Sequence, residues 1–339
     1  MDISRRDFLK LSGAGLLALA LANLRLDEVL AQAARVSFQG RATYSGVPVY
    51  DAPAFKAKKL SLLGKDQVVG ITESVLGDGD HNRVWYRFDG GFTYSGWLQP
   101  VRTTLQKPVT KLPRARVLGE VTVPFAETRN MPEASSGRAY RAYYGTTHWV
   151  TGVYNSKQDG SPWYQVYDSH GDLFFYVAAE QMRLVPDGEL ALLSPDVPDS
   201  QKYIHVDLRT QYVTAFEGEK LVLRTRCSSG AGPKTPLGDF QTYHKGPSIH
   251  MTNEGDATTR IYDLPGVPWV SFFTGNGEAF HGTYWHNDFG KKRSHGCVNL
   301  PTSAAKFIYR WTRPTVPPET DYLHAPKTGT AVHIIKSET

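Results

Sequence analysis

The residues best suited to covalent chemistry lie between His281 and Asn299, near the carboxyl-terminal end of the chain. Cys297 follows His295 by two residues and His281 by sixteen (297 − 281). A thiol with an ordinary pKa near ~8.5 is only a few per cent ionised at neutral pH, so it needs a base to act as a nucleophile. Histidine, with an ordinary pKa near ~6.5, is the side chain best able to take that proton. The pattern predicts acyl transfer by a cysteine with a histidine base.

Gly296, which directly precedes the cysteine, allows a tight turn with a positive φ and leaves room for a substrate backbone. Backbone N–H groups in such a turn, those of His295, Gly296 and Cys297, are candidates for an oxyanion hole. Residue types and spacing do not decide which histidine is the base. His281, His286 and His295 all remain candidates on these grounds.

Two motifs in this part of the chain resemble the L,D-transpeptidase (YkuD-like) catalytic domain family. The first is Ser-His-Gly-Cys-Val-Asn at residues 294–299, with His281 upstream, and the second is Thr-Pro-Leu-Gly at residues 235–238. The resemblance covers residues 200–336. The distance from His281 to Ser294 is at the short end for the family, which predicts a shorter or differently shaped loop over the site.

The resemblance implies roles for the central residues. It makes Cys297 the nucleophile, and it makes His281 the base that activates the thiol and then protonates the leaving amine, a role typically worth a factor of ~10² to 10⁴ in rate. His295 is expected to be an orienting or electrostatic partner that lies near the thiolate and lowers the pKa of the thiol.

Other residues nearby are expected to bind the substrate or to support the oxyanion hole. They are Gly296, Ser294, Asn299, Gly282, Tyr284 and Trp285. For Ser294 and Asn299 the alternative is hydrogen bonding to local turn carbonyls, and for Trp285 it is packing alone. Residues 244–269 are expected to form a lid, in which His244 and His250 are ordinary exposed histidines.

The activity that the resemblance implies is peptidoglycan L,D-transpeptidation. Cys297 attacks the carbonyl of the third, diamino residue of a tetrapeptide stem, D-Ala leaves, and an amine of a second stem takes the acyl group from the thioester. Attack by water makes the same site an L,D-carboxypeptidase. No metal or organic cofactor is expected, and by family analogy carbapenems acylate Cys297.

Three other functions use the same residues differently. A zinc hydrolase would use His281, His286, His295 and Cys297 as ligands, but their spacing matches no metal motif and no water-activating carboxylate is evident. A non-enzymatic wall-binding protein would have a degenerate site, whereas this motif is intact. A cysteine amidase usually presents its cysteine before its histidine, which is the opposite of the order here.

The second cysteine, Cys227, ends an apolar strand pattern and is expected to be a small packed side chain. An exported protein can pair its cysteines, but a nucleophile must stay free. Cys227 and Cys297 are therefore predicted not to form a disulfide.

The amino terminus has the pattern of a twin-arginine export signal. Residues 4–10 read Ser-Arg-Arg-Asp-Phe-Leu-Lys, and the apolar run 11–22 is too short for a bilayer that needs ~20 residues. Residues 31–33 (Ala-Gln-Ala) are the predicted cleavage site, with residues 18–20 and 20–22 as rivals, so residues 1–33 are taken as the signal peptide. The alternative is an uncleaved helix that anchors the protein to the membrane.

The formal net charge of +5 is mild and scattered over the 339 residues. It lacks the Arg/Lys stripe of a nucleic-acid-binding protein, and it suits weak attraction to an anionic cell wall. No nucleic-acid partner is expected. The expected partners are peptidoglycan stem peptides.

Short apolar runs separated by turn residues predict a mainly β chain. Trp85-Tyr86 has an echo in Trp163-Tyr164 at an offset of 78 residues (163 − 85), which indicates a duplication. Residues 38–104 and 116–186 resemble bacterial SH3-like wall-associated modules. Two such small barrels are expected either to bind wall glycan or to act as spacers before the catalytic domain at 200–336.

Within the third domain the pattern predicts a hairpin of strands 211–216 and 220–227. Further strands are expected at 240–243, 270–273 and 332–335, the last closing the sheet. Thr302 or Ser303 is predicted to cap a helix whose face is formed by Ala304, Phe307, Ile308 and Trp311. The resemblance implies a mostly β catalytic fold with this one helix packed on it.

Overall fold

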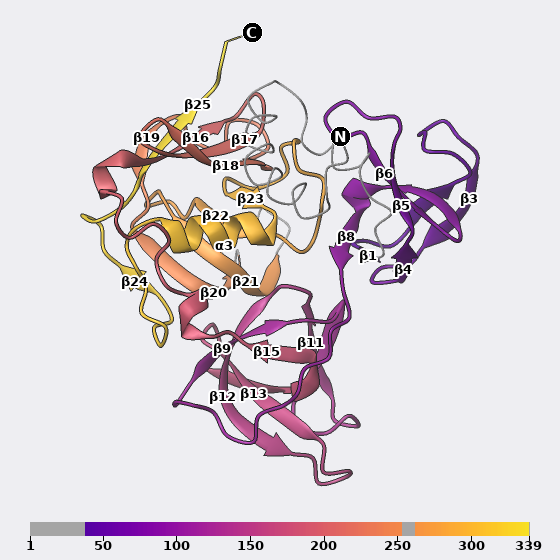
Figure 1. Ribbon diagram of the computed structural model, residues 1–339. Helices are drawn as coiled ribbons and strands as arrows, with labels where there is room; N and C mark the ends of the chain where they lie inside the picture. Colours follow the sequence, from indigo (N-terminus) through magenta and orange to yellow (C-terminus); the bar gives the residue numbers. More distant parts are fainter. Residues whose placement is uncertain (1–37, 253–261, 339) are drawn as a thin grey trace, which may run out of the picture. The chain divides into compact units, whose positions relative to one another are not determined.

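The computed structural model describes residues 38–252 and 262–338 (Figure 1). The predicted signal peptide therefore lies outside the described residues. The described chain is mainly β, as predicted, and it divides into two compact units at the Leu98–Gln99 bond. No helix among the described residues is long and apolar enough to cross a membrane. The domain boundaries proposed from the sequence stay predictions.

The first unit consists of short strands in two sheets, of order β3-β2-β7-β6-β5 and β4-β1-β8. Its elements are β1 (Phe38–Ala42), β2 (Val47–Tyr50), β3 (Lys59–Leu63), β4 (Val68–Ile71), β5 (Glu73–Leu76), β6 (Val84–Phe88), β7 (Gly91–Tyr94), the 3-10 turn η1 (Ser95–Trp97) and β8 (Leu98–Val101), which runs across the unit boundary. Trp85 is fully buried and packs edge-on against Tyr50 and Tyr94. Trp85 is therefore a core aromatic of this unit.

The second unit begins with one antiparallel sheet of seven strands, of order β11-β10-β14-β13-β12-β9-β15. Its elements are β9 (Val117–Val121), β10 (Phe125–Arg129), β11 (Arg138–Tyr143), β12 (Thr147–Asn155), β13 (Pro162–Asp168), β14 (Leu173–Ala178), the 3-10 turn η2 (Ala179–Gln181) and β15 (Met182–Leu184). Val150, Tyr164 and Val166 lie in its core.

The strand order of this sheet matches that of the first unit. Only Thr72 separates β4 from β5, so the two can be counted as one bent strand that corresponds to the nine-residue β12. The order in the first unit is then β3-β2-β7-β6-(β5β4)-β1-β8. Each position in this order corresponds to the same position in the order of the seven-stranded sheet. Trp85 on β6 and Trp163 on β13 occupy equivalent strands. This topology supports a duplication, and the SH3-like assignment stays a prediction.

The rest of the second unit contains two five-stranded sheets and one α-helix. The first sheet has the order β18-β17-β16-β25-β19, and its strands are β16 (Lys202–Asp207), β17 (Tyr212–Glu217), β18 (Lys220–Arg226), β19 (Gly238–Gln241) and β25 (Ala331–Ile335). The second has the order β23-β22-β21-β20-β24, and its strands are β20 (His244–Thr252), β21 (Asp263–Phe272), β22 (Ala279–Gly282), β23 (Val298–Leu300) and β24 (Leu323–His324). The 3-10 turns η3 (Asp187–Glu189) and η4 (Asp199–Gln201) precede them.

The helix α3 (Thr302–Trp311) follows β23 directly and packs on β21 and β22 (Figure 1). Ala304, Ile308 and Trp311 enter the core together with Val298 and Leu300 of β23, and Phe307 packs against it. The predicted helix face is therefore confirmed. The predicted cap is wrong, because Pro301 occupies the N-cap position and no side chain caps the helix.

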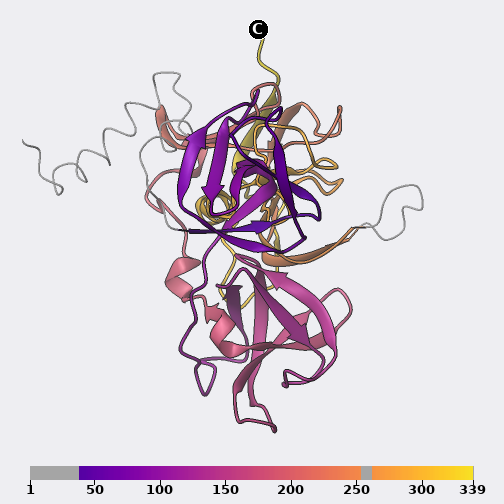
Figure 2. The same cartoon turned by 90° about the vertical axis from the view of Figure 1, so that its right-hand side faces the viewer.

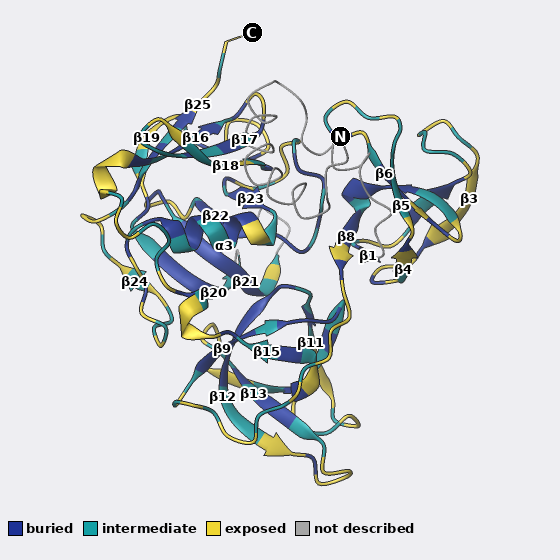
Figure 3. Ribbon diagram, viewed as in Figure 1, coloured by how far each residue is buried: buried dark blue, intermediate teal, exposed yellow. Residues whose placement is uncertain are grey.

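The predicted hairpin is confirmed as β17 and β18. The predicted last strand is β25, which lies between β16 and β19, parallel to the first and antiparallel to the second. The predicted lid is mainly a hairpin of β20 and β21, with residues 253–261 outside the described residues. Strand β21 is buried over most of its length (Figure 3), and the far end of the hairpin extends from the body of the domain (Figure 2).

Lys245 on β20 is 1% exposed and ties this strand to the end of α3. Its Nζ donates to the carbonyls of Thr312 and Pro314, both at 2.8 Å, and to that of Tyr309. Tyr309 belongs to the last turn of α3, where carbonyls lack a partner within the helix, Thr312 is the C-cap, and Pro314 lies in the segment that follows.

Replacing Lys245 by Met should therefore lower the free energy of unfolding by about 3 kcal/mol, because three buried carbonyls lose their donor. Chemical denaturation would measure the change. The matched control is Lys336→Met, which removes an exposed lysine and should change stability by less than about 0.5 kcal/mol. Equal stability of the two variants would contradict the stabilising role of the Lys245 hydrogen bonds.

Candidate active site

The backbone of β22 and β23 brings His281 and Cys297 to neighbouring strands. The two strands are parallel, with Phe280 opposite Val298 and His281 opposite Asn299. Extending this register by one residue places Cys297 opposite Ala279. Because alternate side chains of a strand point to the same face, His281, Asn299 and Cys297 belong to one face of the sheet. The structure thus brings together the two residues predicted to be base and nucleophile.

The other side of β23 is held by the segment that follows β18. Ser228 and Asn299 exchange both backbone hydrogen bonds, at 2.9 and 3.0 Å. Ser294 continues this pairing, since its N–H donates to Ser229 and its carbonyl accepts from Ala231. The segment before Cys297 is therefore fixed by backbone contacts to residues about 65 positions earlier in the chain.

Thr235 joins the two motifs that carry the sequence resemblance. Its hydroxyl donates to the carbonyl of Gly296 at 2.7 Å and accepts the N–H of Gly230 at 2.8 Å. Thr235 is 3% exposed, so both bonds are shielded from water. The Thr-Pro-Leu-Gly element of residues 235–238 thus begins with a direct support for the turn that presents Cys297.

Ser294 fixes the same turn from inside. Its hydroxyl accepts the N–H of Gly296 at 3.1 Å and donates to the carbonyl of Cys297. Gly296 has φ +153°, and a Cβ there would lie 3.0 Å from Cγ of Glu278. Since the Gly296 N–H is engaged, it is not free to bind an oxyanion in this arrangement. Of the three predicted donors, those of His295 and Cys297 remain.

Cys297 is a free, partly exposed thiol. Its Sγ donates to the carbonyl of Gly277 at 3.7 Å, and its side chain packs against the cluster of Val267, Val270 and Ala279. Burial raises the pKa of the thiol to about 11, and the carboxylate of Glu278 adds to the shift, whereas backbone N–H groups of Ala279 and Cys297 oppose it. At pH 7 this shift favours the protonated thiol.

His281 is buried, at 2% exposure, and its Nδ1–H donates to the carbonyl of Gly282 at 3.1 Å. This hydrogen bond selects the tautomer in which Nε2 carries a lone pair, the form that can accept a proton. Burial lowers the pKa of His281 to about 4. Within the described residues no hydrogen bond joins it to Cys297, and the pKa shifts of the two groups both favour their neutral forms.

His295 lies differently from what was expected. It is exposed, and its ring stacks on Tyr262 with a centroid distance of 5.7 Å. The pKa of Cys297 is raised, because burial of the sulfur dominates, and the predicted effect of His295 on the thiol stays a prediction. Whether His295 touches the substrate stays a prediction.

Asn299 and His286 form a buried polar pair behind the site. The side-chain amide of Asn299 lies 3.0 Å from Nε2 of His286, and Nδ1 of His286 accepts the N–H of Asp288 at 3.3 Å. Burial, with the charge of Arg293, lowers the pKa of His286 to about 3. Both ring nitrogens are engaged, which makes His286 a poor candidate for the base.

Among the described residues no three His, Cys, Asp or Glu side chains group as a metal site, so the zinc alternative has no ligand set there.

The remaining predicted residues are mostly packed. Tyr284 is 4% exposed and stacks on Tyr143 of β11 at 5.0 Å, which favours packing over a place in a substrate groove. Trp285 is half-buried, and its ring centroid lies 5.6 Å from that of His281, so Trp285 packs beside the predicted base. Gly282 allows close approach of α3, since a Cβ there would lie 3.2 Å from Cα of Thr302.

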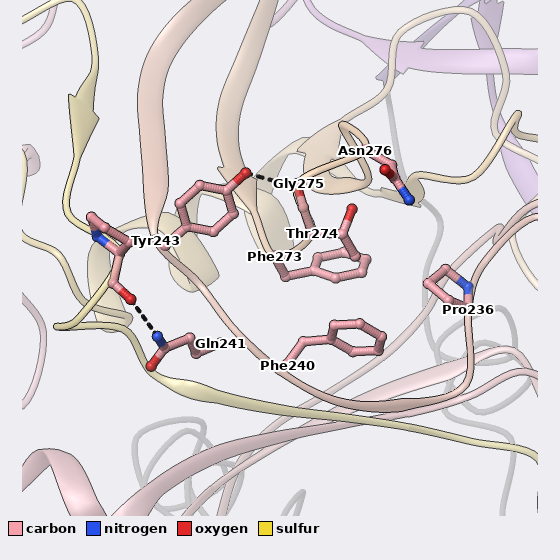
Figure 4. Close-up of a pocket in the computed structure, with 9 residues that line it drawn as sticks. Pro236, Phe240, Gln241, Tyr243, Phe273, Thr274, Gly275 and Asn276 are labelled. Atoms are coloured by element: carbon pink, nitrogen blue, oxygen red, sulfur yellow. Dashed lines mark hydrogen bonds between the residues drawn. The ribbon is translucent and has the colours of Figure 1, made fainter.

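A pocket of about 460 Å³ lies beside the loop that contacts Cys297 (Figure 4). It is lined by Pro236, Phe240, Gln241, Tyr243, Phe273, Thr274, Gly275, Asn276 and Pro326. The hydroxyl of Tyr243 donates to the carbonyl of Thr274 at 2.8 Å, and the amide of Gln241 donates to the carbonyl of Pro326. Residues 274–276 of the loop line this pocket, and Gly277 of the same loop contacts the sulfur of Cys297.

Sequence reasoning missed several contacts near the site. His250, expected to be an ordinary exposed histidine, is half-buried and bonds Asp168 at 2.6 Å and also Asp263. Burial acts to lower the pKa of His250, but the bonds to the two carboxylates outweigh it and raise the pKa.

The position of Glu278 beside Gly296 was also not predicted. Its only signal in the sequence is that it follows the turn Gly275-Asn276-Gly277. His244, likewise expected to be exposed, is half-buried among aromatic rings.

The candidate site thus lies in a mainly β domain with one described helix. It combines Cys297, a free cysteine directly before β23, with His281, a buried histidine on the neighbouring strand β22. Residues 201–334 match the family model of the L,D-transpeptidase catalytic domain (YkuD), and residues 2–22 match that of the twin-arginine translocation pathway signal sequence. The chain therefore contains an L,D-transpeptidase catalytic domain and a signal for export. No curated protein matches the chain.

Solved structures with similarity to this chain include L,D-transpeptidases from two organisms. A cysteine-to-serine mutant of the Enterococcus faecium enzyme is 23% identical, with 40% of this chain and 50% of that chain covered and a TM-score of 0.32. The catalytic domain of the E. faecium enzyme is 26% identical, with coverage of 40% and 96% and a TM-score of 0.32. L,D-transpeptidase 3 from Mycobacterium tuberculosis is 17% identical, with coverage of 49% and 74% and a TM-score of 0.33. The chain thus spans half the length of the first of these relatives.

The raised pKa of Cys297 predicts how its reactivity depends on pH. The rate of alkylation by iodoacetamide should rise about tenfold per pH unit from pH 7 to pH 10, because the thiolate fraction does so below the thiol pKa. Peptide mass mapping would assign the label to Cys297, with Cys297→Ala as control. A rate that is already level below pH 8 would indicate a resting thiolate–imidazolium pair instead.

The position of Thr235 predicts that its hydroxyl stabilises the fold. Thr235→Val keeps the shape of the side chain but leaves the buried Gly296 carbonyl and Gly230 N–H without this partner, which should cost about 2 kcal/mol of unfolding free energy. Thr235→Ser retains the hydroxyl and is the matched control. Denaturant titration measures both, and a valine variant as stable as the serine variant would contradict the role.

Proposed function

We propose that this protein is a peptidoglycan L,D-transpeptidase with Cys297 as nucleophile and His281 as base. The observation that carries the proposal is the pairing of β22 with β23, which sets a free, partly exposed thiol next to a histidine whose Nε2 is left to accept a proton. The match of residues 201–334 to the L,D-transpeptidase catalytic domain supports the reaction class.

The proposed reaction has two acyl-transfer steps. Cys297 attacks the carbonyl of the third, diamino residue of a tetrapeptide stem while His281 takes the thiol proton. His281 returns that proton to the leaving nitrogen, D-Ala departs, and a thioester remains. An amine of a second stem then attacks the thioester, and the sulfur leaves and is reprotonated.

A neutral resting pair suits this order of events. A buried imidazolium is unfavourable, as the lowered pKa of His281 indicates, so proton transfer should accompany attack rather than precede it. The thiolate then exists only when a carbonyl is in place to accept it. Backbone N–H groups of His295 and Cys297 are the proposed oxyanion donors, each typically worth about 10²-fold.

Two related structures suggest an inhibitor class. The M. tuberculosis relative is described in complex with a faropenem-derived adduct, and an E. faecium catalytic domain as acylated by ertapenem. By this analogy we propose that carbapenems acylate Cys297. The acylation would provide a direct mass label for the nucleophile.

Two further parts of the proposal concern partners and place. The stem peptides are the proposed substrates, and wall glycan is a proposed ligand of residues 38–104 and 116–186. The chain carries a twin-arginine signal, so it is exported to where peptidoglycan lies. L,D-carboxypeptidase activity, in which water replaces the second stem, is the alternative at the same site, and a non-enzymatic wall-binding protein is the other.

The proposal predicts the behaviour of Cys297→Ala and His281→Gln with a disaccharide-tetrapeptide. Wild type should release one D-Ala and form a cross-linked dimer. Cys297→Ala should do neither, and His281→Gln should slow thioester formation by about 10² to 10⁴, because general base catalysis is lost. Intact-mass analysis follows thioester and products.

The control for fold is the melting temperature of each variant. Product formation that persists in Cys297→Ala but disappears on adding a chelator would favour a zinc hydrolase. Release of D-Ala without any dimer would assign the site to L,D-carboxypeptidase activity.

A further inference from the structure

Glu278 lies at the base of the loop that connects β21 with β22. The backbone closes this loop, since the N–H of Phe273 donates to the Glu278 carbonyl at 3.0 Å. The hydroxyl of Thr274 accepts the N–H of Glu278 at 3.2 Å and donates to Oε2 of its carboxylate. The carboxylate is therefore held in one position by its own loop.

That position is next to the nucleophile. The residue before Glu278, Gly277, has its carbonyl 3.7 Å from Sγ of Cys297. A Cβ built on Gly296, the residue before Cys297, would lie 3.3 Å from Oε1 of Glu278. The charge of Glu278 acts on the sulfur, because it contributes to the raised pKa of Cys297. The carboxylate thus borders the turn that presents the sulfur.

No lysine or arginine in residues 38–252 or 262–338 forms a salt bridge with Glu278. Its carboxylate is half-buried and bonded only to Thr274 within those ranges. A negative charge beside a thiol opposes thiolate formation, so it hinders the first step of a cysteine-dependent reaction. The negative charge of Glu278 would favour the reaction if a cation binds beside it at a later step.

We propose that Glu278 binds the ammonium group of the acyl acceptor and so favours transfer to an amine over hydrolysis. The inference rests on the proposed L,D-transpeptidase function and adds a specificity residue to it. An acceptor stem presents a positively charged amine at neutral pH, whereas water carries no charge. A carboxylate beside the thioester raises the local concentration of the charged amine but not that of water.

The proton steps of this transfer balance. The bound ammonium loses one proton to water, and the neutral amine stays hydrogen-bonded to Glu278. As its nitrogen forms the C–N bond to the thioester carbon, the nitrogen becomes acidic and gives a second proton to the carboxylate. The C–S bond breaks, the sulfur leaves with the bonding pair, and Glu278 passes the proton to it. Amide and thiol result, and Glu278 is again ionised.

The test measures thioester formation and thioester partition separately. Wild type and Glu278→Gln are loaded with a disaccharide-tetrapeptide, and D-Ala release, dimer and tripeptide are quantified as the concentration of a second stem with a free side-chain amine is varied. In Glu278→Gln the dimer-to-tripeptide ratio should fall about tenfold, with a higher apparent KM for the acceptor. D-Ala release in the first turnover, which precedes acceptor binding, should be unchanged or faster, because the carboxylate opposes thiolate formation.

Three variants sharpen the result. Glu278→Asp retains the charge and should recover part of the ratio, and Thr274→Val, which frees the carboxylate from its hydroxyl partner, should lower it less than Glu278→Gln does. Glu219→Gln removes an exposed charge from the β17–β18 turn and should leave the ratio unchanged. Added NaCl should lower the ratio in wild type and much less in Glu278→Gln, because screening acts only where the charge is present.

The alkylation profile gives a readout that does not depend on turnover. Removing the carboxylate should shift the pH dependence of Cys297 alkylation to lower pH. A dimer-to-tripeptide ratio in Glu278→Gln equal to that of wild type, with normal D-Ala release, would overturn the inference and leave the proposed function intact. Absence of D-Ala release and of thioester in wild type would instead overturn the proposed function.

Discussion

The hydroxyl of Thr235 is the contact on which the geometry of the site depends. It bonds the carbonyl of Gly296 and the N–H of Gly230 at once, so one side chain joins the turn before Cys297 to the loop after β18. Backbone pairing of Ser228 with Asn299 continues the same connection along β23. Because these bonds are buried, the turn cannot move without exposing or losing them.

Burial sets the chemical state of the two central residues. Taking charge out of water raises the pKa of Cys297 and lowers that of His281, so both shifts favour neutral forms. An unpaired thiolate outside the cell would be open to oxidation and to reaction with other electrophiles. A thiol that ionises only during attack avoids this exposure, at the expense of a slower first step.

Local patterns in the sequence were enough for part of the fold. Alternation revealed β17 and β18, and helical spacing revealed the buried face of α3. The position of Cys297 beside His281 came from a recognised motif, since spacing alone left three histidines open. The burial of His286 and its bond to Asn299 distinguish these histidines only once the tertiary structure is known.

Other features depend on residues far away in the chain and had no local signal. Tyr284 is buried because Tyr143 of β11 covers it, and His250 is paired because Asp168 of β13 reaches it. The direction of the Cys297 pKa shift depends on how much apolar structure surrounds the sulfur, which a motif does not encode. The helix α3 begins at Thr302, so Pro301 and not a hydroxyl residue occupies its N-cap position.

The double pairing of His250 has a consequence for how the second unit responds to its surroundings. The imidazole connects β20 to the end of β13 through Asp168 and to β21 through Asp263. Its raised pKa means that this contact is fully present below about pH 6.5 and is lost as the pH rises through the higher value in the folded state. The contact between the seven-stranded sheet and the β20–β21 hairpin is therefore strongest at a pH below the raised pKa of His250.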